Sequence, residues 1–472
     1  MRTIQAQPAS YQRLLLQAVG LGMLFSAPAW VYFLYNSADY PIGLGFVFVP
    51  VIAAGTVVLC QQLTRGEHPW GRKLLVSAVA AKLAAAGAYT FVMFNVYHGA
   101  GDAALYYSFG SNWAASFATP DGTRALTPFY STNFVIMLTG ALVHLLGNSL
   151  VTLIAFYALV AFWGEYFLYR AFRIGMPEGD ACDFGLLAFL LPSAVFWSAT
   201  VGKEALIVFG VGLCIYGYAR AALRADPRGY VLTALGLAVS FLVRPHVAAM
   251  LGLALTASVC LSSNRRGLWG LLNKFVGVPL LLAATYFVAT EARTFLNASD
   301  FQQGVENLGY IQRNSAVGGS VFDVNQGLTF RVLMSPFLMF RPFPWEVTNI
   351  PMALASLEGV ALAVLCFRRR RSLLYALANW RSPLILFVLV YSLVYMVVFS
   401  AATSNFGVLT RQRVMVSPVA LMLVCLPRAG WRVVAGRWTS RLRWSVAPLP
   451  QGTMPDSART LSGPSVTRRR MR

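Results

Sequence analysis

The stretch FWSATVGKEALIVFG, residues 196–210, decides how we expect this chain to fold. It places Lys203 and Glu204 side by side between two apolar runs, LLAFLLPSAVFWSAT before them and ALIVFGVGLCIYGYARAAL after them. A charge at the centre of a bilayer costs about 2.5–3.5 kcal/mol, whereas a charge at the interface with a neighbour available for pairing costs much less. The runs are therefore predicted to be membrane helices joined by a charged turn. This turn is either an ordinary polar connection or part of a functional site.

The composition of the whole chain agrees with this interpretation. Of its 472 residues, 57% are hydrophobic and 12% are charged, and the mean hydropathy is +0.60. Apolar stretches long enough to cross ~30 Å of hydrocarbon as helices recur from residue 14 to residue 426. The first, residues 14–35, is longer than a usual signal-peptide core and is expected to remain as a helix. The sequence therefore predicts an all-α polytopic membrane protein with about twelve transmembrane helices.

The basic residues predict the orientation of the chain. The net charge of +21 could indicate nucleic-acid binding, but Lys and Arg cluster in short loops and in the tail, where membrane topology explains them. The basic loops lie at residues 65–73, 170–173, 220–228, 265–274 and 368–371. With both termini in the cytoplasm, every one of these loops follows the positive-inside rule. We expect a multi-pass protein of the cell's inner (plasma) membrane, with membrane lipids as partners and no nucleic acid.

Two large loops are expected on the outer side of the transmembrane domain, which covers residues 1–426. The first, residues 97–147, ends in a short apolar run at 133–146 that we interpret as a helix on the outer membrane surface. If that run crossed the membrane, the Arg-rich loops after it would face outward. The second large loop is 291–352, and the shorter outer segments are 36–43, 199–204, 244–246 and 403–413. Residues 427–472 are predicted to form a basic cytoplasmic tail, partly disordered.

Polar and aromatic residues of the outer segments are candidates for one polar cavity. They are Asp102, Tyr106, Tyr107, Lys203, Glu204, Arg244, His246, Arg313, Arg331, Arg341, Glu346, Arg411 and Arg413. The cations would hold a phosphate or pyrophosphate, while Asp102 would accept a proton as the catalytic base. Asp102 could instead be the N-cap of a helix that begins AALYY, and Asp121 is a second candidate base. The arginines could also snorkel toward lipid headgroups, and Arg341 could pair with Glu346.

A series of spans and short signatures, over roughly residues 75–225, resembles a known family. An inside N-terminal helix is followed by an outer loop containing GDAALYY and then by NSLVTLIAFYALVAFWGEYFLYRAFRIG and LPSAVFWSATVGKEALIVFGVGLCIYGYARA. This pattern resembles the N-terminal module of GT-C membrane glycosyltransferases that use polyprenyl-phosphate sugars, including protein mannosyltransferases and lipid A aminoarabinose transferase. That family usually carries an acidic pair in the first outer loop, whereas GDAALYY contains Asp102 alone.

The resemblance implies a glycosyltransferase of cell-surface polysaccharide or glycoconjugate assembly. It would transfer a sugar, with inversion, from a polyprenyl-phosphate-linked donor to a lipid, glycan or protein acceptor on the outer face. Asp102 is then expected to be the base for the acceptor, and the cations to stabilise the departing lipid phosphate. The first outer loop has no clustered acidic motif and the six cysteines have no ligand spacing, so we predict no metal and no other cofactor.

Two other functions stay open. An O-antigen-type polysaccharide polymerase or ligase would fit the long late outer loop with FRPFPWE and TRQR, and it would need no carboxylate in the first loop. A lipid-linked sugar flippase or transporter would fit the number of helices, although no two-half repeat is evident. Three charges inside apolar stretches, Lys82, Glu165 and Glu358, either form buried pairs or face the cavity.

Overall fold

The computed structural model describes residues 43–65, 69–96, 98–99, 101–116, 126–262 and 328–428, with single residues at 279, 286, 290, 303 and 307. The first expected helix, Asp121, Arg313, most of the second outer loop and nearly all of the tail lie outside these residues.

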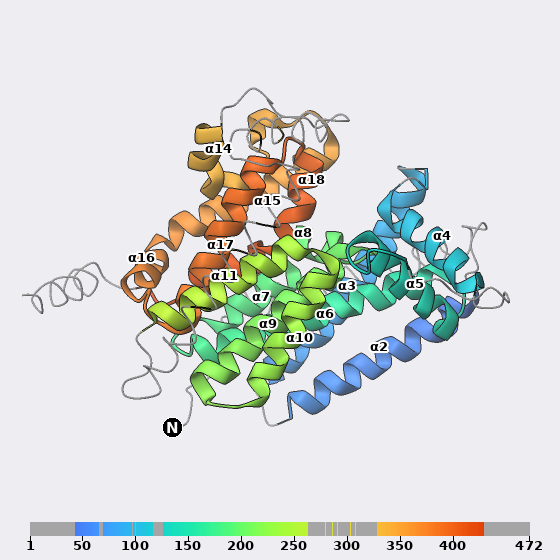
Figure 1. The fold of residues 1–472 in the computed structure, drawn as a ribbon, viewed down its shortest axis with the longest axis horizontal. Helices are drawn as coiled ribbons and strands as arrows, with labels where there is room; N and C mark the ends of the chain where they lie inside the picture. Colours follow the sequence, from blue (N-terminus) through green and yellow to red (C-terminus); the bar gives the residue numbers. More distant parts are fainter. Residues whose placement is uncertain are drawn as a thin grey trace, which may run out of the picture. The chain divides into compact units, whose positions relative to one another are not determined.

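Helices are the regular elements of the described residues (Figure 1). The first half of the chain forms α2 (Gly43–Leu63), α3 (Pro69–Asn95), α4 (Asp102–Ala115), α5 (Thr132–Leu146), α6 (Leu150–Gly175), α7 (Ala181–Leu190), α8 (Pro192–Trp197), α9 (Lys203–Arg224), α10 (Arg228–Val243) and α11 (Pro245–Leu261). The second half forms α14 (Leu328–Met334), η2 (Ser335–Phe340), η3 (Pro344–Glu346), α15 (Ile350–Arg368), α16 (Arg370–Ala378), α17 (Pro383–Ala402), α18 (Phe406–Gln412), η4 (Arg413–Met415) and α19 (Ser417–Val424).

Five of these helices are apolar and long enough to cross a membrane, namely α3, α6, α9, α15 and α17. Phe406–Met415 and Ser417–Val424 together make a sixth candidate, bent by 62° at the break between them. The described residues therefore have the architecture of an α-helical polytopic membrane protein, and the predicted fold class is confirmed to that extent. The larger number of helices and the likeness to the GT-C family stay predictions.

Small residues bring α6, α9 and α10 into close contact at the centre of the bundle (Figure 1). A Cβ atom on Gly212 of α9 would collide with the backbone carbonyl of Gly164 on α6. On the other side of α9, Gly217 and Gly229 of α10 exclude each other's Cβ in the same way. Membrane helices pack by van der Waals contact where small residues let their backbones approach. This packing fixes the position of α9, whose first turn carries Lys203 and Glu204.

The charged turn predicted from residues 196–210 is present. Helix α8 ends at Trp197 and α9 begins at Lys203, so the pair occupies the first turn of a helix. The apolar run before the turn is divided into α7 and α8 at Leu191, because Pro192 has no backbone N–H and disfavours the helical conformation of the residue before it. The sequence predicted the turn but not this interruption.

Besides buried pairs within the helices, polar contacts between distant segments lie at both ends of the helices. At one end, Lys203 reaches the start of α5. At the other end, Arg369 pairs with Asp183, and the backbone N–H of Asp180 donates to the carbonyl of Cys425 at 2.8 Å. Segments expected on the outer side thus contact one another, as do segments expected on the inner side. The structure agrees with the predicted alternation of sides; which end faces the cytoplasm stays a prediction.

The apolar run at 133–146 forms the predicted helix, α5. It packs closely on α4. The two backbones approach so closely at Gly140 that a Cβ atom there would collide with the carbonyl of Gly110. The hydroxyl of Tyr107 on α4 donates to Asn148 Oδ1 at 2.6 Å, just before α6 begins. Helices α4 and α5 therefore form a packed pair, and along the chain this pair follows α3 and precedes α6. The position of α5 on the membrane surface stays a prediction.

Candidate functional site

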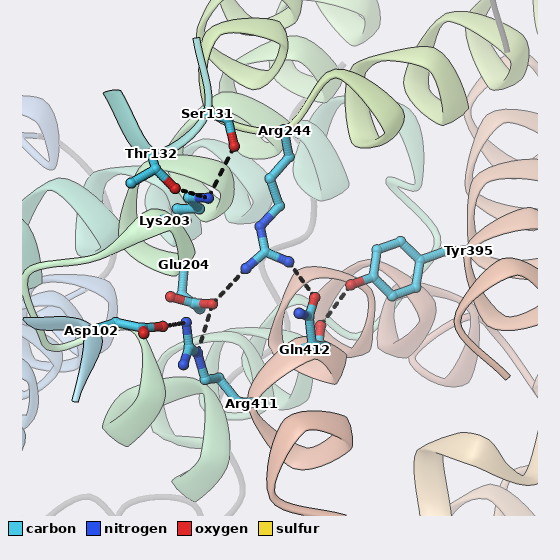
Figure 2. A network of polar contacts seen from close by, with 9 residues as sticks. All are labelled: Asp102, Ser131, Thr132, Lys203, Glu204, Arg244, Tyr395, Arg411 and Gln412. Atoms are coloured by element: carbon cyan, nitrogen blue, oxygen red, sulfur yellow. Dashed lines mark hydrogen bonds and ion pairs between the residues drawn. The ribbon is translucent and has the colours of Figure 1, made fainter. Parts of the chain in front are cut away.

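Charged side chains from four separate segments meet where several helices begin or end (Figure 2). Asp102 is the first residue of α4, Glu204 is the second residue of α9, and Arg411 lies in the last turn of α18. Arg244 lies between α10 and α11, in an extended conformation that the following Pro245 favours. We call Asp102, Glu204, Arg244 and Arg411 the charged network.

Glu204 is the centre of the charged network. Its Oε1 accepts a hydrogen bond from Nη2 of Arg244 at 2.8 Å and another from Nε of Arg411 at 2.8 Å. Glu204 and Arg244 are both buried, with 1% and 7% of their surfaces exposed. A buried carboxylate is tolerated only when it is paired and hydrogen-bonded, and two guanidinium groups supply that compensation here.

Asp102 forms the exposed edge of the same network. Nη2 of Arg411 donates to Asp102 Oδ2, and half of the Asp102 side chain is accessible to solvent. The alternative interpretation of Asp102 as an N-cap is wrong: Gly101 occupies the N-cap position of α4, and no side-chain cap bond is formed there. The carboxylate is instead aimed at Arg411 across the boundary between α4 and α18 (Figure 2).

Lys203 and Glu204 do not serve as each other's partners. Nζ of Lys203 donates to Ser131 Oγ and Thr132 Oγ1, both at 3.0 Å, at the start of α5. Consecutive side chains on a helix point about 100° apart, so neighbours in sequence face different surroundings. Lys203 therefore ties α9 to α5, while Glu204 joins the arginines.

Two residues that sequence reasoning did not identify complete the arrangement. Nη1 of Arg244 donates to the side-chain oxygen of Gln412, and the hydroxyl of Tyr395 donates to the backbone oxygen of Gln412 at 2.8 Å. Gln412 lies between the two arginines of the TRQR motif, and this position in the sequence could have identified it as a candidate site residue. Tyr395 lies inside the apolar helix α17, and nothing in its sequence context singled it out.

The aromatic candidates of the first loop separate into two environments. Tyr106 is buried beside the charged network; burial first, and then the carboxylates of Asp102 and Glu204, raise its pKa to about 12. Tyr107 instead donates to Asn148 and so belongs to the connection between α4 and α6. His246, the second residue of α11, lies against the ring of Phe399, with the ring centroids 6.3 Å apart.

The other arginine candidates that the structure describes contact protein groups outside the charged network. Arg413 pairs with Glu358 at 2.8 Å and donates to the carbonyls of Met339 and Arg341 at 3.2 and 3.0 Å. Glu358 in turn accepts from the backbone N–H and the hydroxyl of Ser193, at 2.7 and 2.6 Å. Arg413 is 1% exposed, so it forms part of the buried packing between α15, η4 and α8. Its expected role in substrate binding stays a prediction.

Two of these candidates, Arg331 and Arg341, precede α15, and protein groups satisfy them as well. Nη1 of Arg331 donates to the carbonyl of Thr403 at 3.0 Å. Arg341 pairs with Glu346, as predicted, and its guanidinium lies 5.0 Å from the centroid of the Phe406 ring. The structure does not bring these residues into the charged network, and a substrate-binding role for them stays a prediction.

The open question about charges inside apolar stretches is answered in favour of buried pairs. Nζ of Lys82 lies 2.7 Å from Glu165 Oε1, and both side chains are inaccessible to solvent. Lys82 also donates to Ser198 Oγ at 2.5 Å and to the carbonyl of Ala194 at 3.0 Å, at the end of α8. This pair therefore connects α3 and α6 to the turn that precedes Glu204.

The network, together with Lys203, contains three cations and two carboxylates. Such a set can bind an anion through its guanidinium groups and accept a proton at the exposed carboxylate. Within the described ranges, no group of three His, Cys, Asp or Glu residues is placed to hold a metal ion. Comparisons with protein-family models, with curated proteins and with solved structures found no match.

Proposed function

We propose that this protein is a membrane glycosyltransferase of the GT-C type. In this proposal it moves a sugar from a polyprenyl-phosphate-linked donor to a lipid, glycan or protein acceptor on the outer face of the membrane. The observation that supports the proposal is the contact of Asp102 with Arg411 at the exposed edge of a network drawn from four segments. All four segments were expected on the same side of the membrane.

The chemistry of such a transfer matches the groups present. The acceptor oxygen attacks the anomeric carbon of the sugar, its proton passes to the carboxylate of Asp102, and the bond from the sugar to the phosphate oxygen breaks. The negative charge that develops on the departing lipid phosphate needs fixed positive charge, which Arg411 and Arg244 supply. Glu204 holds both guanidinium groups on one oxygen atom and keeps them in place.

The polymerase or ligase alternative depended on arginines that now have partners. Arg341 pairs with Glu346 and Arg413 pairs with Glu358, so two of the cations expected to contact a lipid pyrophosphate are already compensated. Neither pairing bears on the network around Asp102, which the transferase requires. Arg411 and Arg244 are paired as well, so what favours the transferase is the half-exposed carboxylate of Asp102 in that network, which a polymerase or ligase would not need.

Lipid analysis of a strain that lacks the protein tests the proposal. Polyprenyl-linked sugars and surface glycans are extracted and compared with the parent strain by mass spectrometry. The transferase predicts accumulation of a polyprenyl monophosphate sugar, together with loss of one sugar from the glycan. Accumulation of complete pyrophosphate-linked repeat units would instead identify a polymerase or ligase, and unchanged lipids would contradict both.

A further inference from the structure

The two ion pairs of Arg411 differ in how firmly they are held. Toward Glu204, Arg411 forms a bond of 2.8 Å to a carboxylate whose side chain is 2% exposed. Toward Asp102, it bonds a carboxylate whose side chain is 50% exposed. The same guanidinium group thus contacts two carboxylates (Figure 2), one of them buried and the other half-exposed.

We infer that Asp102 is an exchangeable partner of Arg411, and that a phosphate group entering the site displaces it and frees its carboxylate. The inference rests on the proposed function only in taking the phosphate to be that of the lipid-linked donor. Glu204 is the positioning residue in this exchange, because it holds Arg411 through Nε while the other side of the guanidinium changes partner.

The difference in burial decides which partner is replaced. Ion pairs at the surface contribute little, because water already solvates both charges and their long side chains lose freedom in pairing. Removing one partner of a buried pair leaves an uncompensated charge in a medium of low polarity, which is far more costly. A phosphate can therefore replace Asp102 readily, whereas replacing Glu204 would leave a buried carboxylate beside Arg244 without one of its two guanidinium groups.

Arg244 adds a second positive charge next to the same anion. It shares the acceptor atom Glu204 Oε1 with Arg411, so the two guanidinium groups lie on either side of one oxygen. Its Nε is buried and has no hydrogen-bond partner among the described residues. An N–H group left in that condition costs free energy, and the guanidinium group that carries it adds positive charge beside the anion that replaces Asp102.

The exchange would couple donor binding to activation of the acceptor. While Arg411 donates to Asp102 Oδ2, that oxygen is occupied by the guanidinium group and does not face an acceptor hydroxyl. Once phosphate takes that position on Arg411, Asp102 becomes available to the acceptor hydroxyl. Base and leaving-group stabiliser are thus assembled only when the donor is present, which disfavours reaction of an acceptor in an empty site.

Binding of a short-chain prenyl phosphate to the full chain in lipid nanodiscs tests the exchange. Farnesyl monophosphate is the probe and farnesol the matched uncharged ligand. The variants are Asp102→Asn, Arg411→Gln and the double variant. Asp226→Asn is the control, because Asp226 forms a comparable exposed pair with Arg220 at the other end of the helices. Thermal unfolding of each variant verifies that it is folded.

Loss of a competing carboxylate should tighten phosphate binding. We expect Asp102→Asn to bind farnesyl monophosphate about fivefold more tightly than the unchanged protein, the factor that corresponds to an exposed ion pair. Asp226→Asn should not change the affinity, and farnesol binding should not respond to Asp102→Asn. Because the competition acts through Arg411, the gain should disappear when Asp102→Asn is introduced into Arg411→Gln.

Two kinds of result overturn the inference, and they differ in what they say about the function. If Asp102→Asn does not raise the affinity for farnesyl monophosphate, or raises it equally in the Arg411→Gln background, Asp102 does not compete for Arg411. That result would leave the proposed transferase function unaffected. If no variant prefers farnesyl monophosphate over farnesol, the network does not bind phosphate, and the proposed function loses its leaving-group site as well.

Discussion

The carboxylate of Glu204 accepts a hydrogen bond from Nε of Arg411 at 2.8 Å, although 207 positions separate the two residues in the chain. Glu204 lies in the first turn of α9, in the middle of the sequence, and Arg411 lies in the last turn of the short helix α18, toward the C-terminus. Their contact joins the two halves of the described chain at one end of the helices. The same oxygen of Glu204 also holds Arg244, which makes this residue the point from which the site is organised.

Residues at the two ends of the helices should be accessible from opposite sides of the membrane. Cysteine is introduced separately at Asp102, in the charged network, and at Asp226, in the loop between α9 and α10. A membrane-impermeant maleimide added to intact cells should label the first variant, and should label the second only after the cells are opened. The unchanged protein, with its six native cysteines, provides the background. Labelling of both variants from one side would overturn the assigned topology.

The Lys82–Glu165 pair should matter mainly for stability. Both side chains are fully buried and their charged atoms are 2.7 Å apart. Lys82→Met leaves the carboxylate without its cation and should cost about 3–5 kcal/mol of the free energy of unfolding. The double variant Lys82→Met, Glu165→Leu should recover much of that loss, because no buried charge remains. Denaturation in detergent measures both, and equal stability of the single variant and the unchanged protein would contradict the pairing.

Two neighbouring arginines should respond differently to the same substitution. Arg413 is fully buried against Glu358, so Arg413→Met should lower the free energy of unfolding by about 3–5 kcal/mol. Arg411 is partly exposed, and Glu204 keeps Arg244 when Arg411 is lost, so Arg411→Met should cost less stability and instead weaken phosphate binding. Yield, unfolding and farnesyl monophosphate binding are compared for the two variants. The distinction fails if Arg411→Met lowers stability as much as Arg413→Met and leaves binding intact.

Tyr106 should remain a neutral hydrogen-bond donor over the working pH range. Burial and the carboxylates of Asp102 and Glu204 raise its pKa to about 12. For an acid, a raised pKa means that the protonated form persists to higher pH, so the hydroxyl should not ionise below that value. Transfer activity measured against pH should therefore have the same alkaline limb in Tyr106→Phe as in the unchanged protein. A limb that moves or disappears in the variant would assign it to Tyr106.

Much of the site could be predicted because a membrane limits where charges can lie. The apolar stretches predicted the turn at Lys203 and the helix at 133–146, and the predicted alternation of sides placed Asp102, Glu204, Arg244 and Arg411 at the same end of the helices. Hydropathy and charge patterns suffice to predict which segments are helical and on which side their ends lie, because they describe which residues enter lipid.

The partners of each charge could not be predicted from the same patterns. Arg411 and Arg413 stand two residues apart in TRQR, yet one faces the network and the other the buried Glu358, because α18 ends between them at Gln412. The Lys82–Glu165 pair depends on how α3 and α6 are rotated about their axes. Such directions arise from tertiary packing, as between Gly164 and Gly212, which no single segment specifies.

The most direct measurement is complementation of a strain that lacks the protein, read out by mass spectrometry of its polyprenyl-linked sugars. The strain receives either Asp102→Asn or Asp226→Asn, each verified to be present in the membrane in equal amount. Asp226→Asn should restore the parental lipids, whereas Asp102→Asn should leave a polyprenyl monophosphate sugar accumulated, since the base that activates the acceptor is missing. Restoration by both variants would contradict the role of Asp102, and with it the assignment of the charged network as the site of sugar transfer.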